Sequence, residues 1–276
     1  MKNRWIFIVA AVVLIAGIGF VAMKLHKGTS SPASEPAPLP VQKLLDEATQ
    51  AETSGDSMKA RTAYQQIVSE HPDYDKVEDI QTKLGQLNMS ILFSKEQTPQ
   101  TEMYQVQMGD SLGKLAKQYG TTKELIKRSN GLKSDVIRIG QNLRIWKASF
   151  AVFVSKSQNT LILKSGEDVM KIYHVSTGRD KKENNTPVGT FKVGSKIANP
   201  VWFKPGGQPV PPESPENELG SRWMGFDTDP HYGIHGTIHP EVIGSPATAG
   251  CVRMANPDVE ELFDIIPMGT KITIQE

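Results

Sequence analysis

The first long pattern in the chain is an uncharged apolar run, residues 5–23, with basic residues on both sides. A helix over this run would be about 28 Å long, close to the thickness of the hydrocarbon core of a bilayer. The run is longer than the apolar part of a signal peptide. We therefore predict a membrane anchor over 1–27, with a buried soluble helix as the alternative. The predicted protein is a single-pass cell-membrane protein whose folded part is extracytoplasmic, in the periplasm or cell wall.

Residues 28–40 are rich in Pro and Ser and lack apolar periodicity, which predicts an extended linker. Through 41–95 apolar residues recur at helical spacing and predict three helices, separated near Gly55 and Pro72. The pattern resembles one tetratricopeptide-type helical hairpin, which implies a groove for a protein partner. A single repeat buries its own apolar face poorly, and a plain helical spacer is the reading that we favour.

The pattern changes again over 102–147. Short alternating stretches at 104–106 and 139–146 predict two strands. Between them lie two helical patterns, the first capped by Asp110 or Ser111 and the second opened by a capping box at Thr121. The order strand, helix, helix, strand predicts a small α+β module with both helices on one face of a two-stranded sheet.

From residue 149 onward the chain is rich in short alternating runs, which predict a mainly β domain over 149–276, either a sandwich or a small barrel. The runs are 150–154, 160–163, 171–176, 190–193 and 271–274. The segment 199–220 is rich in Pro, Gly and Glu and is longer than an ordinary connection, which favours a lid or binding loop. Asn256 and Asp258 are predicted to begin one helix.

Composition narrows the range of functions. The formal net charge is +1 and the pI is about 7.8, so nothing in the overall charge suggests a nucleic-acid partner. The chain has a single cysteine, Cys251, which cannot form an internal disulfide. A lone thiol next to a glycine and downstream of a His-Gly pair is a candidate nucleophile.

Cys251 needs a proton acceptor and a group that stabilises an oxyanion. His235 lies 16 positions upstream, a spacing that suits two strands joined by a loop, and we assign it as proton donor and acceptor. The backbone N–H groups of Gly250 and Cys251 are the predicted oxyanion hole. Arg253 would share a strand face with Cys251 and either lower the pKa of the thiol or hold a substrate carboxylate.

His231, His235 and His239 follow at four-residue steps, as metal ligands on a helix do. Gly233, Gly236 and Pro240 oppose a helix there, so we predict no metal site at these histidines. A buried structural cysteine, a surface-exposed Arg253 and polar histidines lining a cleft are the alternatives that single residues leave open.

The segment 102–147 resembles a LysM module. The residues that carry the resemblance are Tyr104, Val106, Gly109, Leu112, Leu125, Asn130, Ile139, Gly140, Gln141, Leu143 and Ile145. The resemblance implies binding to glycans that contain N-acetylglucosamine, with peptidoglycan as the first candidate partner. A passive spacer is the alternative.

The segment 150–275 resembles the L,D-transpeptidase catalytic domain of the YkuD type. The shared residues are His235, Gly236, Thr237, Ile243, Gly244, Thr248, Gly250, Cys251, Val252, Arg253 and Met254, with Ser176, Thr177, Gly178 and the run 186–191 upstream. The resemblance implies Cys251 as nucleophile, His235 as proton acceptor, and Thr248 in the lining of the cleft. We assign Arg253, Thr248, Gly236 and His231 to substrate binding. The chain departs from the family at Ala249, where a His, Lys or Arg is usual.

The resemblance implies a peptidoglycan enzyme without a cofactor. Cys251 would attack the carbonyl between the third residue of a tetrapeptide stem and its terminal D-Ala, and the acyl group would pass to the side-chain amine of a second stem. The alternatives are an L,D-carboxypeptidase that uses the same acyl-enzyme, or a non-catalytic cell-wall-binding protein with a decayed site at Ala249.

Overall fold

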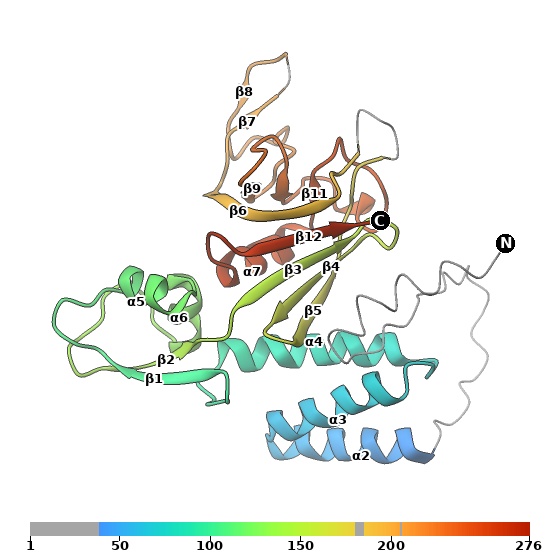
Figure 1. Ribbon diagram of the computed structural model, residues 1–276, viewed down its shortest axis with the longest axis vertical. Helices are drawn as coiled ribbons and strands as arrows, with labels where there is room; N and C mark the ends of the chain where they lie inside the picture. Colours follow the sequence, from blue (N-terminus) through green and yellow to red (C-terminus); the bar gives the residue numbers. More distant parts are fainter. Residues whose placement is uncertain (1–38, 180–184, 205) are drawn as a thin grey trace. The chain divides into compact units, whose positions relative to one another are not determined.

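The computed structural model describes residues 39–179, 185–204 and 206–276. The chain divides into two compact units, Met1–Ile91 and Leu92–Glu276, whose helices and strands are labelled in Figure 1. Each unit contains a cluster of buried apolar side chains of its own.

Three helices make up the helical region: α2 (Leu39–Ser54), α3 (Ser57–Glu70) and α4 (Val77–Phe93). Asp56 begins α3, since its carboxylate accepts a hydrogen bond from the Lys59 amide at 2.9 Å. Apolar residues of all three helices pack in one cluster, in which Tyr64 and Ile67 are almost fully buried. The predicted helical region is confirmed, whereas its likeness to a tetratricopeptide hairpin stays a prediction.

The predicted localisation, a single-pass membrane protein, is contradicted. In the part of the chain that the structure describes, no helix combines the length and the apolar character needed to cross a membrane. α4, for example, carries Glu78 and Asp79 in its first turn. The apolar run 5–23 on which the prediction was based lies outside the described residues. Of the predicted linker 28–40, only residues 39 and 40 are described, and they begin α2.

The first module of the second unit has the predicted order: β1 (Thr101–Gln105), α5 (Leu112–Tyr119), α6 (Lys123–Asn130) and β2 (Asn142–Trp146). β1 and β2 pair antiparallel. Ser111 caps α5 by accepting from an amide of its first turn, as predicted. α6 is capped by Thr122 rather than Thr121, and its hydroxyl accepts from the Leu125 amide at 2.9 Å. Glycines in the left-handed conformation end both helices.

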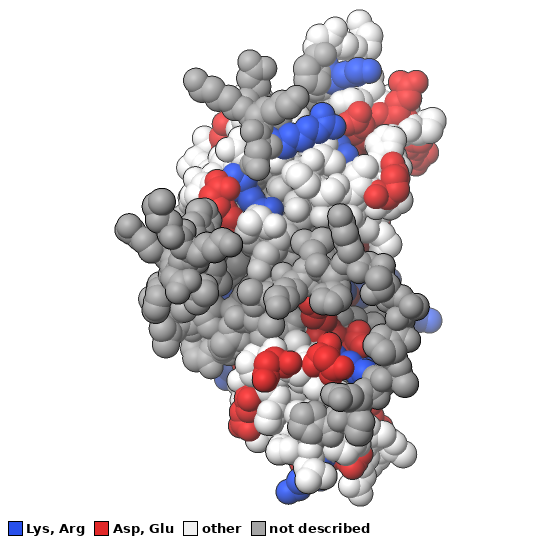
Figure 2. All heavy atoms as spheres, turned by 90° about the vertical axis from the view of Figure 1, so that its right-hand side faces the viewer, with Lys and Arg blue, Asp and Glu red and all other residues white. Residues whose placement is uncertain are grey.

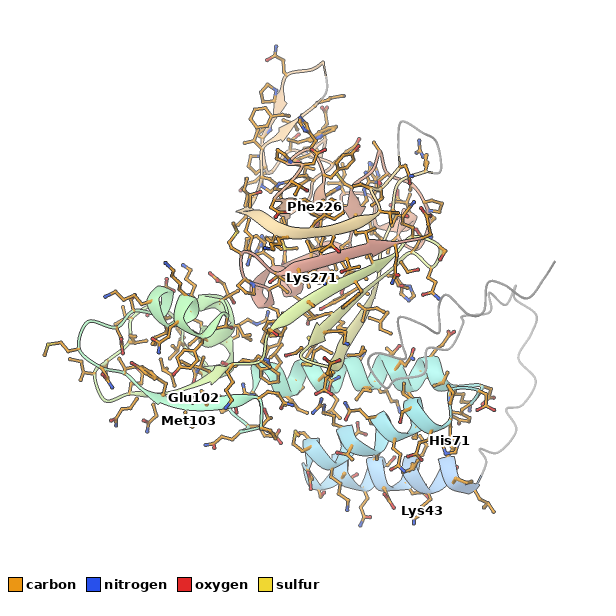
Figure 3. The ribbon with its side chains drawn as sticks, in the orientation of Figure 1. Lys43, His71, Glu102, Met103, Phe226 and Lys271 are labelled. Atoms are coloured by element: carbon orange, nitrogen blue, oxygen red, sulfur yellow. The ribbon has the colours of Figure 1, made fainter. Side chains whose placement is uncertain are left out.

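The catalytic segment forms one eight-stranded sheet in the order β11-β10-β9-β6-β12-β3-β4-β5. Its strands are β3 (Phe150–Ser155), β4 (Thr160–Ser165), β5 (Asp168–His174), β6 (Gly189–Ala198), β9 (Arg222–Phe226), β10 (Gly233–His235), β11 (Val252–Arg253) and β12 (Lys271–Gln275). The 3-10 helix η1 (Pro240–Val242) and the helix α7 (Asn256–Ile265) complete the domain. α7 lies behind the sheet in Figure 1, and Phe226 of β9, labelled in Figure 3, stacks on Phe191 of β6 with ring centroids 4.8 Å apart.

The two edges of this sheet meet. Ser176, just beyond β5, forms a bridge to Arg253 of β11, with both backbone hydrogen bonds at 2.8 Å. The prediction of a mainly β domain is confirmed. The strands form a single curled sheet, and not the two packed sheets of a sandwich; isolated bridges from Ser176 to Arg253 and from Gly178 to Thr248 join its two edges. The curl places the segment after β5 against the cysteine.

The long segment 199–220 contains a small hairpin of β7 (Trp202–Phe203) and β8 (Pro209–Val210). Asn217, near the end of this segment, is 1% exposed. The Asn217 side-chain amide donates to the carbonyls of Pro200, Val210 and Pro211 at 2.9, 3.4 and 3.1 Å. One buried side chain therefore ties together the two ends of the segment.

Charged side chains of both signs are mixed on the face shown in Figure 2. The described Lys and Arg residues drawn there lie among Asp and Glu residues, and do not form one continuous basic area.

Candidate active site

Two short parallel strands carry the predicted catalytic residues. β10 ends at His235, and β11 begins directly after Cys251. The strands pair with His235 opposite Arg253. Side chains alternate along a strand, so Cys251 and Arg253 point to one face, and His235 shares it as the registered neighbour of Arg253. The thiol and the imidazole therefore lie on the same side of the sheet.

His235 is held as a neutral base. Its side chain is buried, and Nδ1 lies 2.6 Å from the carbonyl oxygen of Gly236. A carbonyl oxygen only accepts, so Nδ1 carries the proton and Nε2 keeps its lone pair. Burial, followed by the positive charge of Arg253, lowers the pKa of His235 from 6.5 to about 4. The ring of Trp223, on β9, stacks beside it with centroids 6.0 Å apart.

Cys251 is held as a thiol. Burial raises its pKa from 9.0 to about 11, which outweighs the hydrogen bond from the Gly233 backbone and the charge of Arg253. Its Sγ donates to the carbonyl of His231 at 3.7 Å. The pKa of the thiol lies above that of the imidazole, so the resting pair is neutral. The proton must leave Sγ while the bond to substrate forms.

We expect the pH dependence of Cys251 alkylation to report this resting state. The thiolate is the nucleophile, so the rate of modification by iodoacetamide should rise with pH toward the pKa of about 11. Arg253→Gln should move the profile to still higher pH, since the arginine lowers the pKa of the thiol. Intact mass after timed quenching measures the rates. A plateau already reached near pH 6 would mean a preformed thiolate–imidazolium pair, contrary to this prediction.

The turn before Cys251 is fixed by Thr248 and Gly250. The Thr248 hydroxyl donates to the Cys251 carbonyl at 2.7 Å and accepts from the Gly250 amide at 3.1 Å. The Gly250 amide was one of two predicted oxyanion donors. Because it is engaged with Thr248, the Cys251 amide is the donor that this arrangement leaves available.

The upstream motif lies along the cysteine turn. The amides of Ala247 and Thr248 both donate to the Thr177 carbonyl at 3.0 Å, and the Gly178 amide donates to Thr186 Oγ1 at 2.7 Å. Ser176 pairs with Arg253 as described above. The three motif segments, far apart in sequence, therefore hold one another in place around Cys251.

Arg253 is buried beside this pair but incompletely satisfied. Its side chain is 11% exposed, and Nη2 lies 3.4 Å from Oε2 of Glu218 in the long segment. Its buried Nε has no hydrogen-bond partner. The guanidinium thus has an unpaired N–H donor at Nε close to Cys251, the predicted nucleophile, and a carboxylate would satisfy it.

The other predicted site residues are less central. Gly236 contributes its carbonyl to His235. The His231 side chain is 90% exposed and pairs with Asp229 at 3.0 Å, so this residue enters the site through its carbonyl. His239 pairs with Glu241 at 3.2 Å. Over residues 39–179, 185–204 and 206–276, no three His, Cys, Asp or Glu side chains gather as a metal ion would require.

Comparison with known proteins decides the family. Residues 149–274 match the L,D-transpeptidase catalytic domain, and residues 104–146 match the LysM domain. A Bacillus subtilis relative named as L,D-transpeptidase YqjB is 41% identical over 129 residues, 45% of this chain and 70% of the relative. Another, named as L,D-transpeptidase YkuD of Bacillus licheniformis, is 32% identical over 179 residues, 62% of this chain and 98% of the relative. The chain belongs to the L,D-transpeptidase family.

Both resemblances drawn from the motifs are thereby confirmed, and the protein is an L,D-transpeptidase with a LysM domain. The LysM segment is also 52% identical over 42 residues to LytE of Bacillus subtilis, which is named as a probable peptidoglycan endopeptidase. That match covers 15% of this chain and 13% of LytE.

Three residues near this candidate L,D-transpeptidase site were not predicted from the sequence to belong to it. Trp223 stacks on the base, Glu218 pairs with Arg253, and Asn256 accepts hydrogen bonds from two backbone amides near His235. Asn256 was predicted only as the start of a helix. The one sequence signal for Glu218 was its place in an unusually long Pro- and Gly-rich segment.

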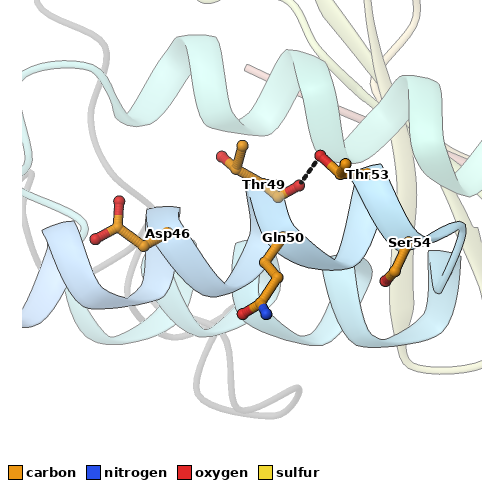
Figure 4. A pocket seen from close by; sticks show the side chains of 5 residues that line it. All are labelled: Asp46, Thr49, Gln50, Thr53 and Ser54. Carbon is orange, nitrogen blue, oxygen red and sulfur yellow. Dashed lines mark hydrogen bonds between the residues drawn. The ribbon is translucent and has the colours of Figure 1, made fainter.

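A shallow hollow outside the L,D-transpeptidase domain is not a candidate site. Its lining, drawn in Figure 4, comes entirely from α2: Asp46, Thr49, Gln50, Thr53 and Ser54. The Thr53 hydroxyl is already used, donating to the Thr49 carbonyl at 2.8 Å. Asp46, the only charged residue among them, accepts from Gln42 at 2.8 Å. The hydroxyls of Thr49 and Ser54 likewise donate to carbonyls of α2, so the hydroxyls and the carboxylate of this hollow are engaged within one helix.

Proposed function

We propose that this L,D-transpeptidase acts on peptidoglycan stems through a Cys251 acyl-enzyme. The observation that carries the proposal is the neutral His235, whose Nδ1–H is held by the Gly236 carbonyl on the sheet face that Cys251 shares. A base with a free Nε2 next to a lone thiol is the arrangement that acyl transfer to a cysteine needs.

The proposed course is as follows. Sγ of Cys251 bonds to the carbonyl carbon between the third residue and D-Ala while His235 Nε2 takes the thiol proton. The C–N bond to D-Ala then breaks, and the imidazolium gives that proton to the leaving amine. The side-chain amine of a second stem attacks the thioester, its proton passes through His235 to the departing sulfur, and a cross-link between third-position residues results. The Cys251 amide supports the oxyanion in both halves.

Arg253 is the proposed site for a carboxylate of the donor stem. Support comes from its unpaired buried Nε and from the carboxylate of Glu218, already 3.4 Å away. Thr248 contributes by fixing the turn before Cys251. Gly236 contributes the carbonyl that accepts from His235, and His231 contributes the carbonyl that accepts from Cys251. With Ala249 at the position before Gly250, these neighbours supply the polar groups that the usual His, Lys or Arg would offer.

Glu218→Gln is expected to lower the KM for a tetrapeptide donor about two- to fivefold with little change in kcat. The reason is that the Glu218 carboxylate competes with substrate for Arg253, and a half-exposed ion pair contributes only about 0–1 kcal/mol. Glu216→Gln, an exposed glutamate of the same segment, is the matched control and should leave KM unchanged. An unchanged or higher KM in Glu218→Gln would argue against a carboxylate site at Arg253.

The LysM domain, proposed to span 102–147, binds the glycan strand and raises the local concentration of stems at the catalytic domain, proposed to span 149–276. Support comes from contacts between the two. Arg128 of α6 forms an ion pair with Asp264 of α7 at 2.9 Å, and Trp146 Nε1 donates to Ser165 at 2.9 Å. The helical region 41–95 is proposed as a spacer, with a protein-binding groove as the alternative to be tested by partner capture.

The proposal is tested by incubating the full chain with a disaccharide-tetrapeptide. Intact mass follows the acyl-enzyme, and chromatography follows D-Ala and the muropeptides. An acyl adduct, D-Ala and a cross-linked dimer are expected. D-Ala with a tripeptide and no dimer would instead favour the L,D-carboxypeptidase alternative. Absence of both adduct and D-Ala, with glycan binding intact, would reject the proposal in favour of a binding-only protein.

A further inference from the structure

Asn256 uses its side chain outside its own helix. It is the first residue of α7, five positions after Cys251, yet the N-terminus of α7 has no side-chain cap. Its Oδ1 instead accepts hydrogen bonds from two backbone amides, Thr237 at 2.9 Å and Ser221 at 3.2 Å. The residue thus joins the segment after the nucleophile to the end of β10 and to the end of the long loop.

The Thr237 amide is half of the peptide group that holds the catalytic base. The N–H of Thr237 and the C=O of Gly236 belong to the same planar peptide unit. That C=O accepts from His235 Nδ1 at 2.6 Å, while the N–H donates to Asn256 at 2.9 Å. Hydrogen bonds in series polarise one another. The acceptor Oδ1 of Asn256 therefore orients the Gly236 carbonyl and makes it a stronger hydrogen-bond acceptor for His235.

Two glycines approach Asn256 Oδ1 so closely that neither position could carry a Cβ without a shift. A Cβ at Gly220 or at Gly236 would each lie 2.2 Å from Asn256 Oδ1. Gly220 also has φ 62, in the left-handed region that glycine favours. Two glycines from separate segments therefore approach the same amide oxygen, as expected if the chain is shaped around it.

We propose that Asn256 is a positioning residue for His235. By holding the peptide between Gly236 and Thr237, it fixes the imidazole in the tautomer with the proton on Nδ1, and Nε2 then faces the reaction. Asn256 touches neither substrate nor the thiol in this role. The kinetic part of this proposal rests on the proposed acyl-transfer function, whereas the state of the His235 ring does not.

The tautomer is read directly by ¹⁵N NMR of the histidine side chains in the full chain. In wild type, His235 is expected to show the neutral form with the proton on Nδ1 throughout the neutral range, because its pKa is about 4. Asn256→Ala is expected to give a mixture of tautomers. Asn256→Asp keeps an acceptor oxygen, so it should restore the single tautomer, and its charge should raise the pKa of His235.

Kinetics supplies the second readout. Asn256→Ala is expected to lower kcat about 10- to 100-fold with KM nearly unchanged, less than the roughly 10²–10⁴-fold that general acid–base catalysis contributes, because the base remains and only its orientation is lost. Asn256→Asp should keep kcat within a few-fold and move the acid limb of the kcat/KM profile to higher pH. If wild type released no D-Ala, the proposed function would fail while the NMR result still decided the role of Asn256.

Asn217→Ala is the matched control. Asn217 is also a buried asparagine whose Oδ1 accepts from a backbone amide, that of Leu219 at 3.0 Å, but that peptide does not contact His235. It should lower the melting temperature and leave the His235 tautomer intact. If Asn256→Ala also left the tautomer and pKa of His235 unchanged and only lowered the melting temperature, its role would be structural and our proposal wrong.

Discussion

Cys251→Ala is expected to abolish both the acyl adduct and D-Ala release, with kcat/KM at least about 10⁴-fold below wild type. Removal of a nucleophile eliminates the covalent route, and what remains is the effect of binding and of oxyanion stabilisation alone. Cys251 is partly exposed, so the substitution should cost little stability. Released D-Ala and intact mass are the measurements.

Cys251→Ser is the accompanying variant. It keeps the size and the donor, but a hydroxyl is a weaker nucleophile than a thiol at neutral pH. It should therefore fall between wild type and Cys251→Ala in its rate of adduct formation. D-Ala release by Cys251→Ala above about 1% of the wild-type rate would require a different nucleophile.

Gly250→Ala is expected to lower kcat by about 100-fold or more, the effect of misplacing a reacting group by about 1 Å. A Cβ there would lie 2.5 Å from Cε1 of the Tyr232 ring and 3.2 Å from the Asn185 carbonyl oxygen. Gly250 also has φ 125, a conformation that costs an alanine about 1–3 kcal/mol. The turn must shift, and Cys251 shifts with it. Single-turnover acylation and thermal melting measure the two effects.

Gly244→Ala is the control that separates the steric clash with Tyr232 from the strain of a positive φ at an alanine. Gly244 has φ 92, but no atom lies within 4 Å of a Cβ built there. It should lower the melting temperature about as much as the strain at Gly250 does, while acylation stays within a few-fold of wild type. Equal loss of acylation in both variants would mean that the contact with Tyr232 is not what positions the cysteine.

The helices and several strands were predictable because their signal is local, whereas β9 was not predicted and only residues 190–193 of the ten-residue β6 were. The alternating run 150–154 corresponds to β3 (Phe150–Ser155), and the helical pattern after residue 256 corresponds to α7. β10 and β11 contain only three and two residues, too few for a period to be seen, so pairing with neighbours defines them. Cys251 and His235 were predicted from their motif instead.

The supporting residues were not predictable for a related reason. Asn256 has an ordinary sequence context for a helix start, and its role depends on Gly220 and Gly236, which only the fold brings to it. Likewise, the ring that requires a glycine at position 250 belongs to Tyr232, eighteen positions earlier. Residue type and spacing along the chain do not predict such close contacts between residues that are distant in sequence.

The closure of the sheet between Ser176 and Arg253 has a consequence for inactivation. The strand that follows Cys251 is two residues long; it pairs with β10 on one side and meets Ser176 at an isolated bridge on the other, and a second isolated bridge joins Gly178 to Thr248. Regions with few hydrogen bonds open at a lower free energy than the whole domain. Warming should therefore break the contact between Ser176 and Arg253, and inactivate the enzyme, at temperatures where amides in the rest of the sheet are still protected from hydrogen exchange.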